Sequence, residues 1–213
     1  SMQRMQNLTG GGNVLVNTPK APDIQQDSLI VNSFTINDYG GSAYAYFYNN
    51  QLQGTFTLSN NALYSGGYSS YFRRNTIIGT ASITNNGGNV FNDADAANSG
   101  NTYLGNVTYT RNGGTMNVGT ADTNSYAGDF VLNNSAALPI NTELIKFVGS
   151  TNTAIDQLGN GSIDIQKLVM AKTSGARVTL NKPVRVTTSC AFLTGYVLST
   201  STNPLIFPDN VSH

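Results

Sequence analysis

Three acidic residues in the middle of the chain are the first candidates for chemistry. Asp93 and Asp95 lie two residues apart, and Asp122 falls near the equivalent corner of the following sequence repeat. Because Ca²⁺ takes carboxylate and amide oxygens from loops, the three side chains are candidate metal ligands. The segment lacks the Gly and the closing Glu of an EF-hand loop. The sequence favours a solvated corner here, and Ca²⁺ is the one cofactor that it leaves open.

Asp93 and Asp95 are also the best candidates for a pair of catalytic carboxylates. Polysaccharide lyases and glycoside hydrolases use acids, or acids with Lys and Arg, gathered on one side of a scaffold. The sequence shows no Lys, Arg or His next to this pair. The only histidine, His213, is the last residue, so no Ser-His-Asp, Cys-His or His-metal arrangement can be built from it. We therefore expect no catalytic site, with an enzyme of this glycan-active class as the alternative.

A cluster of tyrosines and arginines in the first half of the chain is a candidate binding surface. Tyr side chains beside Asn and Arg can hold sugar rings or a protein partner. The alternative is packing within the fold, because Ala and Phe alternate with three of the tyrosines and make both faces of that segment apolar. The candidate binding residues are Tyr44, Tyr46, Tyr48, Tyr68, Tyr71, Arg73 and Arg74.

Basic residues recur every few positions near the C-terminal end. They could form a positive stripe for an acidic glycan, but a solubilising face is the favoured interpretation because apolar strands need charge to resist edge pairing. These residues are Lys167, Lys172, Arg177, Lys182 and Arg185.

The composition limits the classes of partner. The chain has 213 residues, of which 10% are charged, and its net charge is zero. The overall charge therefore gives no reason to expect nucleic acid or an anionic membrane as a partner. No apolar run reaches the roughly 18 residues of a membrane span. The single cysteine, Cys190, lies among apolar neighbours and is expected to be buried.

A sequence phrase of about fourteen residues recurs along the chain, and the fold that it specifies must position all of these side chains. Residues 75–88 return as residues 101–114, and weaker copies surround residues 32, 54 and 128. The anchor positions of the copies (32, 54, 79, 105 and 128) lie 22, 25, 26 and 23 residues apart. A period in this range indicates a repeat architecture, in which each unit buries its apolar face by stacking on the next.

Within each copy, apolar and polar residues alternate with a period of two. This alternation predicts a strand with one buried face, and Asn and Gly after it predict a tight corner. A second apolar stretch follows in most units, so each unit should contain two or three short strands. The apolar positions two residues before, two after and four after the anchors are Ile30, Phe34, Ile36, Leu52, Phe56, Leu58, Ile77, Ala81, Ile83, Tyr103, Val107, Tyr109, Tyr126, Phe130 and Leu132.

Two architectures fit this pattern, and a parallel β-helix fits better than an antiparallel β-sandwich. In a β-helix of about 22–26 residues per coil, equivalent residues stack about 4.8 Å apart and must be of similar type. The rule for parallel crossovers predicts a right-handed solenoid. We expect residues 1–28 to form a cap or first coil, residues 29–149 the repeat coils, and residues 150–213 further coils of the same stack.

The C-terminal strands carry a family resemblance. Residues 165–187, with Val178-Thr-Leu-Asn-Lys-Pro-Val184, resemble a phrase of very large surface proteins of Bacteroidota, and residues 193–207 are similar to its continuation. The coils at residues 79–84 and 105–110 are similar to their repeats. The resemblance implies a β-helical stalk of a secreted, adhesin-like protein exported by the type IX system. Ala171 and Cys190 depart from the family pattern.

Together these observations predict a non-enzymatic, extracellular segment of a longer cell-surface protein. Its repeated Thr, Asn and Tyr faces would contact a glycan or a protein, and no membrane insertion is expected. A Ca²⁺-dependent binder is a weaker alternative. Thr-rich faces could also order water as in an ice-binding protein, but no Thr-x-Thr pattern persists from unit to unit in the sequence.

Overall fold

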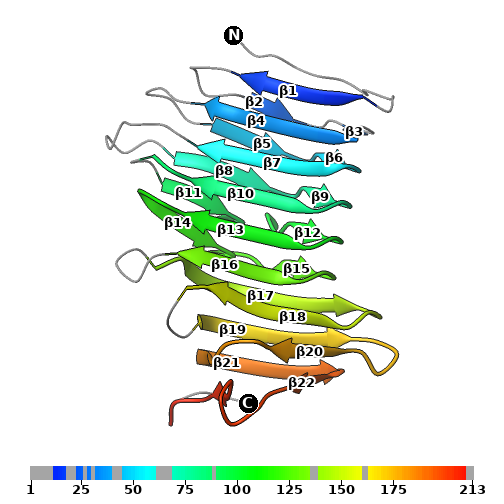
Figure 1. The fold of residues 1–213 in the computed structure, drawn as a ribbon, viewed down its shortest axis with the longest axis vertical. Helices are drawn as coiled ribbons and strands as arrows, with labels where there is room; N and C mark the ends of the chain where they lie inside the picture. The colour runs from blue at the N-terminus through cyan, green and yellow to red at the C-terminus, as the bar shows by residue number, and fades with distance from the viewer. Residues whose placement is uncertain are drawn as a thin grey trace.

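The computed structural model describes residues 12–17, 23–25, 28–29, 32–39, 45–60, 69–87, 90–134, 139–159 and 163–209. These residues contain 23 strands and no helix. Every strand pairing among them is parallel. Figure 1 shows the strands stacked as the rungs of one elongated β-solenoid. The predicted fold class is confirmed, and the antiparallel sandwich is wrong.

One side of the solenoid is a nine-stranded sheet, formed by the strands of the recurring phrase. Neighbours in this sheet are separated by one coil of the chain, so strands from the whole sequence lie in a single ladder (Figure 1). Its strands in order are β1 (Asn13–Asn17), β4 (Ser33–Tyr39), β7 (Thr55–Asn60), β10 (Ala81–Asn85), β13 (Val107–Arg111), β16 (Phe130–Asn134), β18 (Thr153–Leu158), β20 (Arg177–Leu180) and β22 (Tyr196–Leu198).

The remaining strands form a fourteen-stranded sheet with two branches that join at one strand. One branch is β2 (Asp23–Gln25), β5 (Ala45–Tyr48), β8 (Ser69–Arg73), β11 (Val90–Asp93) and β14 (Thr115–Val118). The other is β3 (Ser28–Leu29), β6 (Gln51–Leu52), β9 (Thr76–Ile77), β12 (Thr102–Tyr103) and β15 (Asn124–Tyr126). Both meet β17 (Asn141–Gly149), and β19 (Ile163–Lys172), β21 (Val184–Thr194) and β23 (Leu205–Ile206) follow it.

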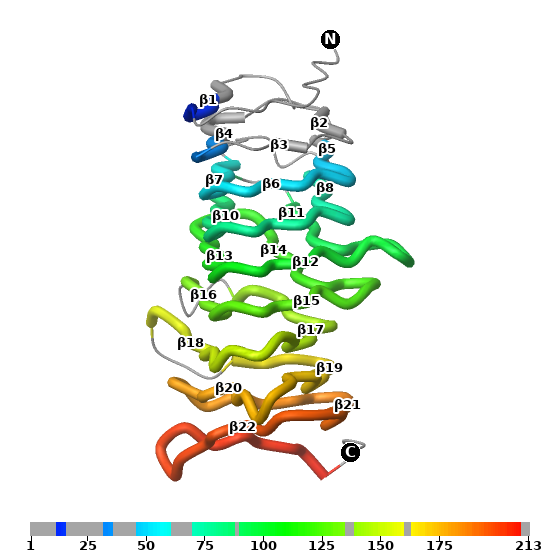
Figure 2. The backbone as a smooth tube through the Cα atoms, turned by 90° about the vertical axis from the view of Figure 1, so that its right-hand side faces the viewer, coloured from blue at the N-terminus to red at the C-terminus, as the bar shows by residue number. Residues whose placement is uncertain are grey.

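The junction at β17 changes the cross-section of the solenoid. In the upper coils, a corner separates the two branches, and each coil has three strands. In β17 the corner is absent, because Asn141 and Thr142 pair with β14 while Ile145 to Phe147 pair with β15. Figure 2 shows the chain protruding between β11 and β12 and between β14 and β15, near the middle of the stack.

The apolar positions of the phrase stack directly on one another inside the solenoid. Phe56 pairs with Ala81 and Ala81 with Val107, while Leu58, Ile83 and Tyr109 form the next column. Of these six residues, Ala81 is 4% exposed and the other five are at most 1% exposed. Buried rings also stack from coil to coil, as in Tyr103 and Tyr126, whose ring planes are 4° apart at 5.2 Å. Stacking of like on like therefore builds one continuous core.

The first described coil departs from the predicted alignment by one residue. Leu52 was expected beneath Ile30, but Leu29 occupies that register. Three residues separate Leu29 from Ser33, whereas two separate Leu52 from Thr55, and Ser33 pairs with Thr55. The extra residue in the earlier coil lies between its two strands. Ile30 itself lies outside the described residues.

Buried asparagines line one corner of the solenoid and bond to the coil above or below. Asn50 donates from its backbone and side-chain nitrogens to Oδ1 of Asn75, at 3.0 and 2.8 Å. Asn75 donates in the same way to Asn101, and the backbone N–H of Asn101 donates to Asn124 Oδ1 at 2.8 Å. The four residues are at most 4% exposed. They satisfy backbone groups that strands cannot reach at the corner.

The anchor glycines of the phrase form a column in which backbones approach closely. A Cβ atom on Gly79 would lie 2.3 Å from the carbonyl oxygen of Gly54, and one on Gly105 would lie 2.4 Å from that of Gly79. A Cβ on Gly128 would lie 2.4 Å from the carbonyl carbon of Gly105. These distances leave no room for a side chain, which explains why the anchors recur as Gly.

We predict that Gly105→Ala destabilises the protein. The added methyl group would press on the backbone of Gly79, which cannot move aside as a flexible side chain would. Overpacking of this kind costs about 1–3 kcal/mol or more. Chemical denaturation followed by circular dichroism measures the change in the free energy of unfolding.

Gly12→Ala is the matched control, because a Cβ at Gly12 meets nothing within 4 Å. We expect this variant to stay within about 0.5 kcal/mol of wild type, as surface substitutions usually do. An equal loss of stability in the two variants would show that the close backbone approach is not the reason for Gly at residue 105.

Candidate functional site

The tyrosine and arginine residues predicted to bind a ligand gather on the outer face of β5 and β8. Tyr46 and Tyr71 are in register, and their rings stack at 5.5 Å with planes 13° apart. Tyr48 meets Tyr46 edge-on at 5.4 Å. Arg73 lies beside these rings, with its Cζ 4.7 Å from the centroid of Tyr71 and 5.2 Å from that of Tyr48. We call Tyr46, Tyr48, Tyr71 and Arg73 the aromatic cluster.

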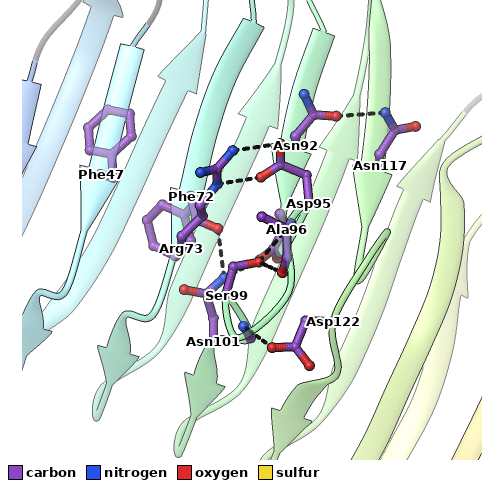
Figure 3. A network of polar contacts seen from close by, with 12 residues as sticks. Phe47, Phe72, Arg73, Asn92, Asp95, Ala96, Ser99, Asn101, Asn117 and Asp122 are labelled. Carbon is purple, nitrogen blue, oxygen red and sulfur yellow. Dashed lines mark hydrogen bonds and ion pairs between the residues drawn. The ribbon is translucent and has the colours of Figure 1, made fainter.

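Asp95 holds the guanidinium of the aromatic cluster in place. Arg73 Nε and NH2 donate to its two carboxylate oxygens at 2.6 and 2.9 Å, a bidentate geometry that fixes the plane of the guanidinium (Figure 3). The hydrogen bond to Asp95 raises the pKa of Arg73. Arg73 is 24% and Asp95 15% exposed at the side chain, so the pair is partly shielded from solvent. The sequence analysis missed this partner, although the two residues lie one coil apart.

Tyr48 keeps its proton in this environment. Burial raises the pKa of Tyr48 to about 12, while the charge of Arg73 opposes that shift. At neutral pH its hydroxyl can therefore both donate and accept hydrogen bonds. The half-buried rings of Tyr46 and Tyr71 also carry hydroxyl groups.

Below the aromatic cluster, the same register position is occupied by asparagines. Tyr71 pairs with Asn92, Asn92 with Asn117, and Asn117 with Asn141. Each lower amide donates to the one above it, from Asn117 to Asn92 and from Asn141 to Asn117, both at 2.8 Å. We call Tyr46, Tyr71, Asn92, Asn117 and Asn141 the outer column. Figure 3 shows the Asn92–Asn117 contact beside Arg73 and Asp95.

The outer column continues in the lower coils as an ion pair. Thr142 pairs with Ile165, which puts Asn141 beside Asp164. Asp164 pairs with Arg185, whose Nε and NH2 both donate to its carboxylate. Both side chains are about half exposed. One face of the solenoid thus presents aromatic, amide and ionic groups in sequence along its length.

The other residues predicted for this surface are placed differently. Tyr44 and Tyr68 lie outside the described residues. Arg74 is exposed at the corner between β8 and β9, where it has a φ of 55° and its backbone N–H donates to Ser99. It takes no part in the contacts of the aromatic cluster. The structure therefore unites four of the seven predicted residues.

The three predicted metal ligands are not brought together. Asp93 points into the core and is fully buried, whereas Asp95 lies outside and binds Arg73. Asp122 accepts hydrogen bonds from the backbone N–H groups of Gly100 and Thr123, as Figure 3 shows for the first of these. Within the described residues there is no group of three or more His, Cys, Asp or Glu that could hold a metal ion.

The same geometry separates Asp93 and Asp95 as a catalytic pair. Strand β11 ends at Asp93, and Ala94 takes a φ of 58°, so the chain turns and the alternation of faces does not carry on to Asp95. The sequence analysis also expected no basic residue nearby, and Arg73 contradicts this expectation because it lies one coil away in space. The two carboxylates do not face a common volume where a glycosidic bond could bind.

Asp93 instead belongs to a buried polar cluster in the core. Its Oδ2 accepts hydrogen bonds from the hydroxyls of Tyr103, at 2.9 Å, and Tyr109, and its Oδ1 accepts one from Asn101. The hydroxyls of Tyr109 and Tyr126 lie 3.2 Å apart. Burial raises the pKa of Asp93 to about 6, although these hydrogen bonds favour the charged form.

The residues of the predicted basic stripe lie in different surroundings. Lys172 is buried, and its Nζ donates to the carbonyl oxygens of Ala127 and Thr151 at 3.2 and 3.0 Å. Arg185 binds Asp164, and Lys182 donates to the carbonyl oxygen of Gly159 at 3.1 Å. These contacts tie neighbouring coils together. The sequence favoured a solubilising face for these residues, and Lys172 departs from that expectation because it is buried.

The comparisons with known proteins add no relative. No family model, curated protein or solved structure matches the chain. Among the described residues there is no helix long and apolar enough to span a membrane. The aromatic cluster and the outer column are therefore interpreted from their own geometry.

We predict that Asp93 makes the protein less stable as the pH rises from about 4 to about 6. The unfolded carboxyl has an ordinary pKa of 3.8, and burial raises it to about 6 in the folded protein. The folded state therefore binds the proton more tightly in this interval, and the free energy of unfolding falls as the proton is lost. The total loss from this group is about 3 kcal/mol, since each pKa unit corresponds to about 1.4 kcal/mol.

Asp93→Asn should remove this component and be more stable than wild type at pH 7, because the amide stays neutral and keeps the shape of the carboxyl group. Denaturant titrations between pH 4 and pH 7 measure the effect. Asp209→Asn, at an exposed position, is the control and should retain the slope of wild type. A wild-type slope in Asp93→Asn would contradict the assignment.

Proposed function

We propose that this chain is a structural and adhesive segment of a large extracellular cell-surface protein, and that it has no catalytic role. In this proposal the solenoid is a rigid stalk, and the aromatic cluster with the outer column is its contact surface for a glycan or a protein. The observation that carries the proposal is the ordered row of Tyr, Arg and Asn side chains on the outside of a stack that has a continuous buried core.

The rigidity of the stack supports a stalk. Each coil is held to the next by parallel backbone hydrogen bonds, by buried aromatic columns and by the asparagines of the corner. A side chain on the outer face therefore keeps a fixed position relative to its neighbours. Groups that are ordered before binding lose less conformational entropy when a ligand arrives, which favours multivalent contact.

The chemistry of the aromatic cluster supports an uncharged or mixed polar ligand. The rings of Tyr46 and Tyr71 stack on each other, so the cluster presents its phenol groups in a fixed arrangement. The charge of Arg73 is matched by Asp95, which makes the cluster a poor site for a simple anion. Tyr and Arg at fixed positions are the residue types that dominate the energetics of binding surfaces.

The proposed origin rests on the resemblance of the C-terminal strands. We propose that the chain is part of an adhesin-like surface protein of Bacteroidota that the type IX system exports. The residues that carry the resemblance form β19 to β23, which continue the sheets of the upper coils. A stalk built of one repeated coil agrees with this arrangement. The alternative, a polysaccharide lyase or glycoside hydrolase, gains no support from Asp93 and Asp95, because one is buried and the other is paired.

We predict that the double variant Tyr46→Ala and Tyr71→Ala loses at least about tenfold in affinity for its ligand, equivalent to about 1.4 kcal/mol. The probes are a printed array of bacterial, plant and animal polysaccharides and an array of extracellular-matrix proteins. Surface plasmon resonance on the strongest ligand then gives the affinities. The solenoid should remain folded, because both side chains are on its outer face.

Tyr196→Ala is the matched control, since Tyr196 is 47% exposed in β22, far from the aromatic cluster. It should bind as wild type does. Equal affinity of the double variant and wild type would refute the cluster as the contact surface. Release of reducing or unsaturated sugars from any polysaccharide on the array would refute the non-enzymatic role.

A further inference from the structure

The nine-stranded sheet has an outer face of hydroxyl groups that the proposed function does not use. Strands β7, β10 and β13 turn their apolar residues inward and their Thr and Ser residues outward. On this face the side chains are half-buried or exposed. We call the following residues the hydroxyl face: Thr55, Thr57, Ser59, Thr80, Ser82, Thr84, Asn106, Thr108 and Thr110.

The register aligns the hydroxyl face into three columns. Thr57, Ser82 and Thr108 form the middle column, and Thr35 of β4 extends it by one coil. Ser59, Thr84 and Thr110 form a second column. Thr55, Thr80 and Asn106 form the third, one residue before the paired positions of Phe56, Ala81 and Val107. A strict Thr-x-Thr ladder is absent, as expected from the sequence, but Ser59 and Ser82 keep a hydroxyl group where Thr is replaced.

The backbone sets the spacing of this array. Equivalent residues of neighbouring strands lie about 4.7–4.9 Å apart, and alternate residues of one strand lie about 6.6 Å apart. One water molecule can bridge two oxygens about 4.8 Å apart with hydrogen bonds of about 2.8 Å to each, and the angle at that water is then close to tetrahedral. Each column can therefore hold a row of water molecules, and the distances between these waters match those in a tetrahedral water network.

The chemistry of the hydroxyl face also differs from that of the outer column. The asparagines of the outer column bond to each other, whereas the hydroxyls of Thr57, Ser82 and Thr108 form no hydrogen bond with other described residues. Within the described residues, the side chains of the array accept hydrogen bonds from other coils at two positions, from Asn133 to Thr110 and from the backbone N–H of Asp129 to Asn106. Two charged residues follow below the array, Asp129 one coil lower and Asp156 two coils lower. The hydroxyls are thus left for solvent.

The side chains themselves are stiff. Thr is branched at Cβ and has few rotamers on a strand, so its hydroxyl and methyl groups stay in place. The face has no aromatic ring in these columns on which a sugar could stack, in contrast to the aromatic cluster on the opposite sheet. A ligand that matches it must itself repeat in two dimensions and must bond to hydroxyls without a charge.

We propose that the hydroxyl face binds ice. The columns would anchor a layer of water whose positions already follow a tetrahedral network, and the methyl groups of Thr would fill the spaces between. This inference is independent of the proposed glycan or protein surface, because the two lie on different sheets.

Thermal hysteresis and partitioning of the labelled protein into a growing ice hemisphere test the proposal. We expect wild type to enter the ice and to depress the freezing point below the melting point. Thr108→Lys, which places a long charged side chain in the middle column, should lose most of both effects. Ser82→Lys is a second variant at the same column, and circular dichroism checks that each variant is folded.

Thr179→Lys is the matched control, because Thr179 is a half-buried, outward Thr of the same sheet whose register neighbours, Ala154 and Leu198, carry no hydroxyl group. It should behave as wild type does. Failure of wild type to enter ice, or an equal loss in Thr179→Lys and Thr108→Lys, would overturn the proposal. Adsorption of wild type to microcrystalline cellulose, abolished by Thr108→Lys and without any effect on ice, would also overturn it in favour of a crystalline polysaccharide.

Discussion

The parallel, in-register hydrogen bonding between coils is the constraint on which the structure depends. Because each strand lies directly on the equivalent strand of the coil before it, every strand position has the equivalent position of the next coil about 4.8 Å away. At Gly79 and Gly105, backbone atoms of the neighbouring coil lie where a Cβ atom would be, so these positions require Gly. An inward ring stacks on a ring, and an outward amide bonds to an amide, as from Asn117 to Asn92. The repeated sequence and the columns of side chains are two consequences of this one arrangement.

The same constraint explains why polar groups enter the core. A corner leaves backbone N–H and C=O groups without a strand partner, and burial of such groups without hydrogen bonds is costly. The Asn50, Asn75 and Asn101 side chains supply those bonds from one coil to the next. Asp93 lies at the lower end of this polar corner, where three Tyr rings replace smaller residues and provide hydroxyl donors. When β17 removes the corner, Ile145 takes the register position of Asn124, and the need for the amide disappears.

Much of the fold could be predicted from the sequence, because the alternation and the repeat period report directly on faces and coils. The columns of Phe56, Leu58 and their equivalents follow from those two signals alone. The site could be predicted less well. Tyr46, Tyr48, Tyr71 and Arg73 were recognised by type, but Asp95 was assigned to a metal site because a two-residue spacing implies a shared face only while the chain is extended. The positive φ of Ala94 interrupts the extended chain between Asp93 and Asp95, and the sequence does not reveal it. The separation of 22 residues between Arg73 and Asp95 was a usable signal, since it equals one coil.

The direction of the bonds between coils has a mechanical consequence. They run along the axis of the rod, so a pull on its two ends loads one ladder at a time at the outermost rung and peels coils off singly. Each released coil of about 23 residues lengthens the chain by roughly 75 Å, given about 3.3–3.6 Å per extended residue. A tether of this design yields in even steps under tension and can rewind on the intact coil beneath it.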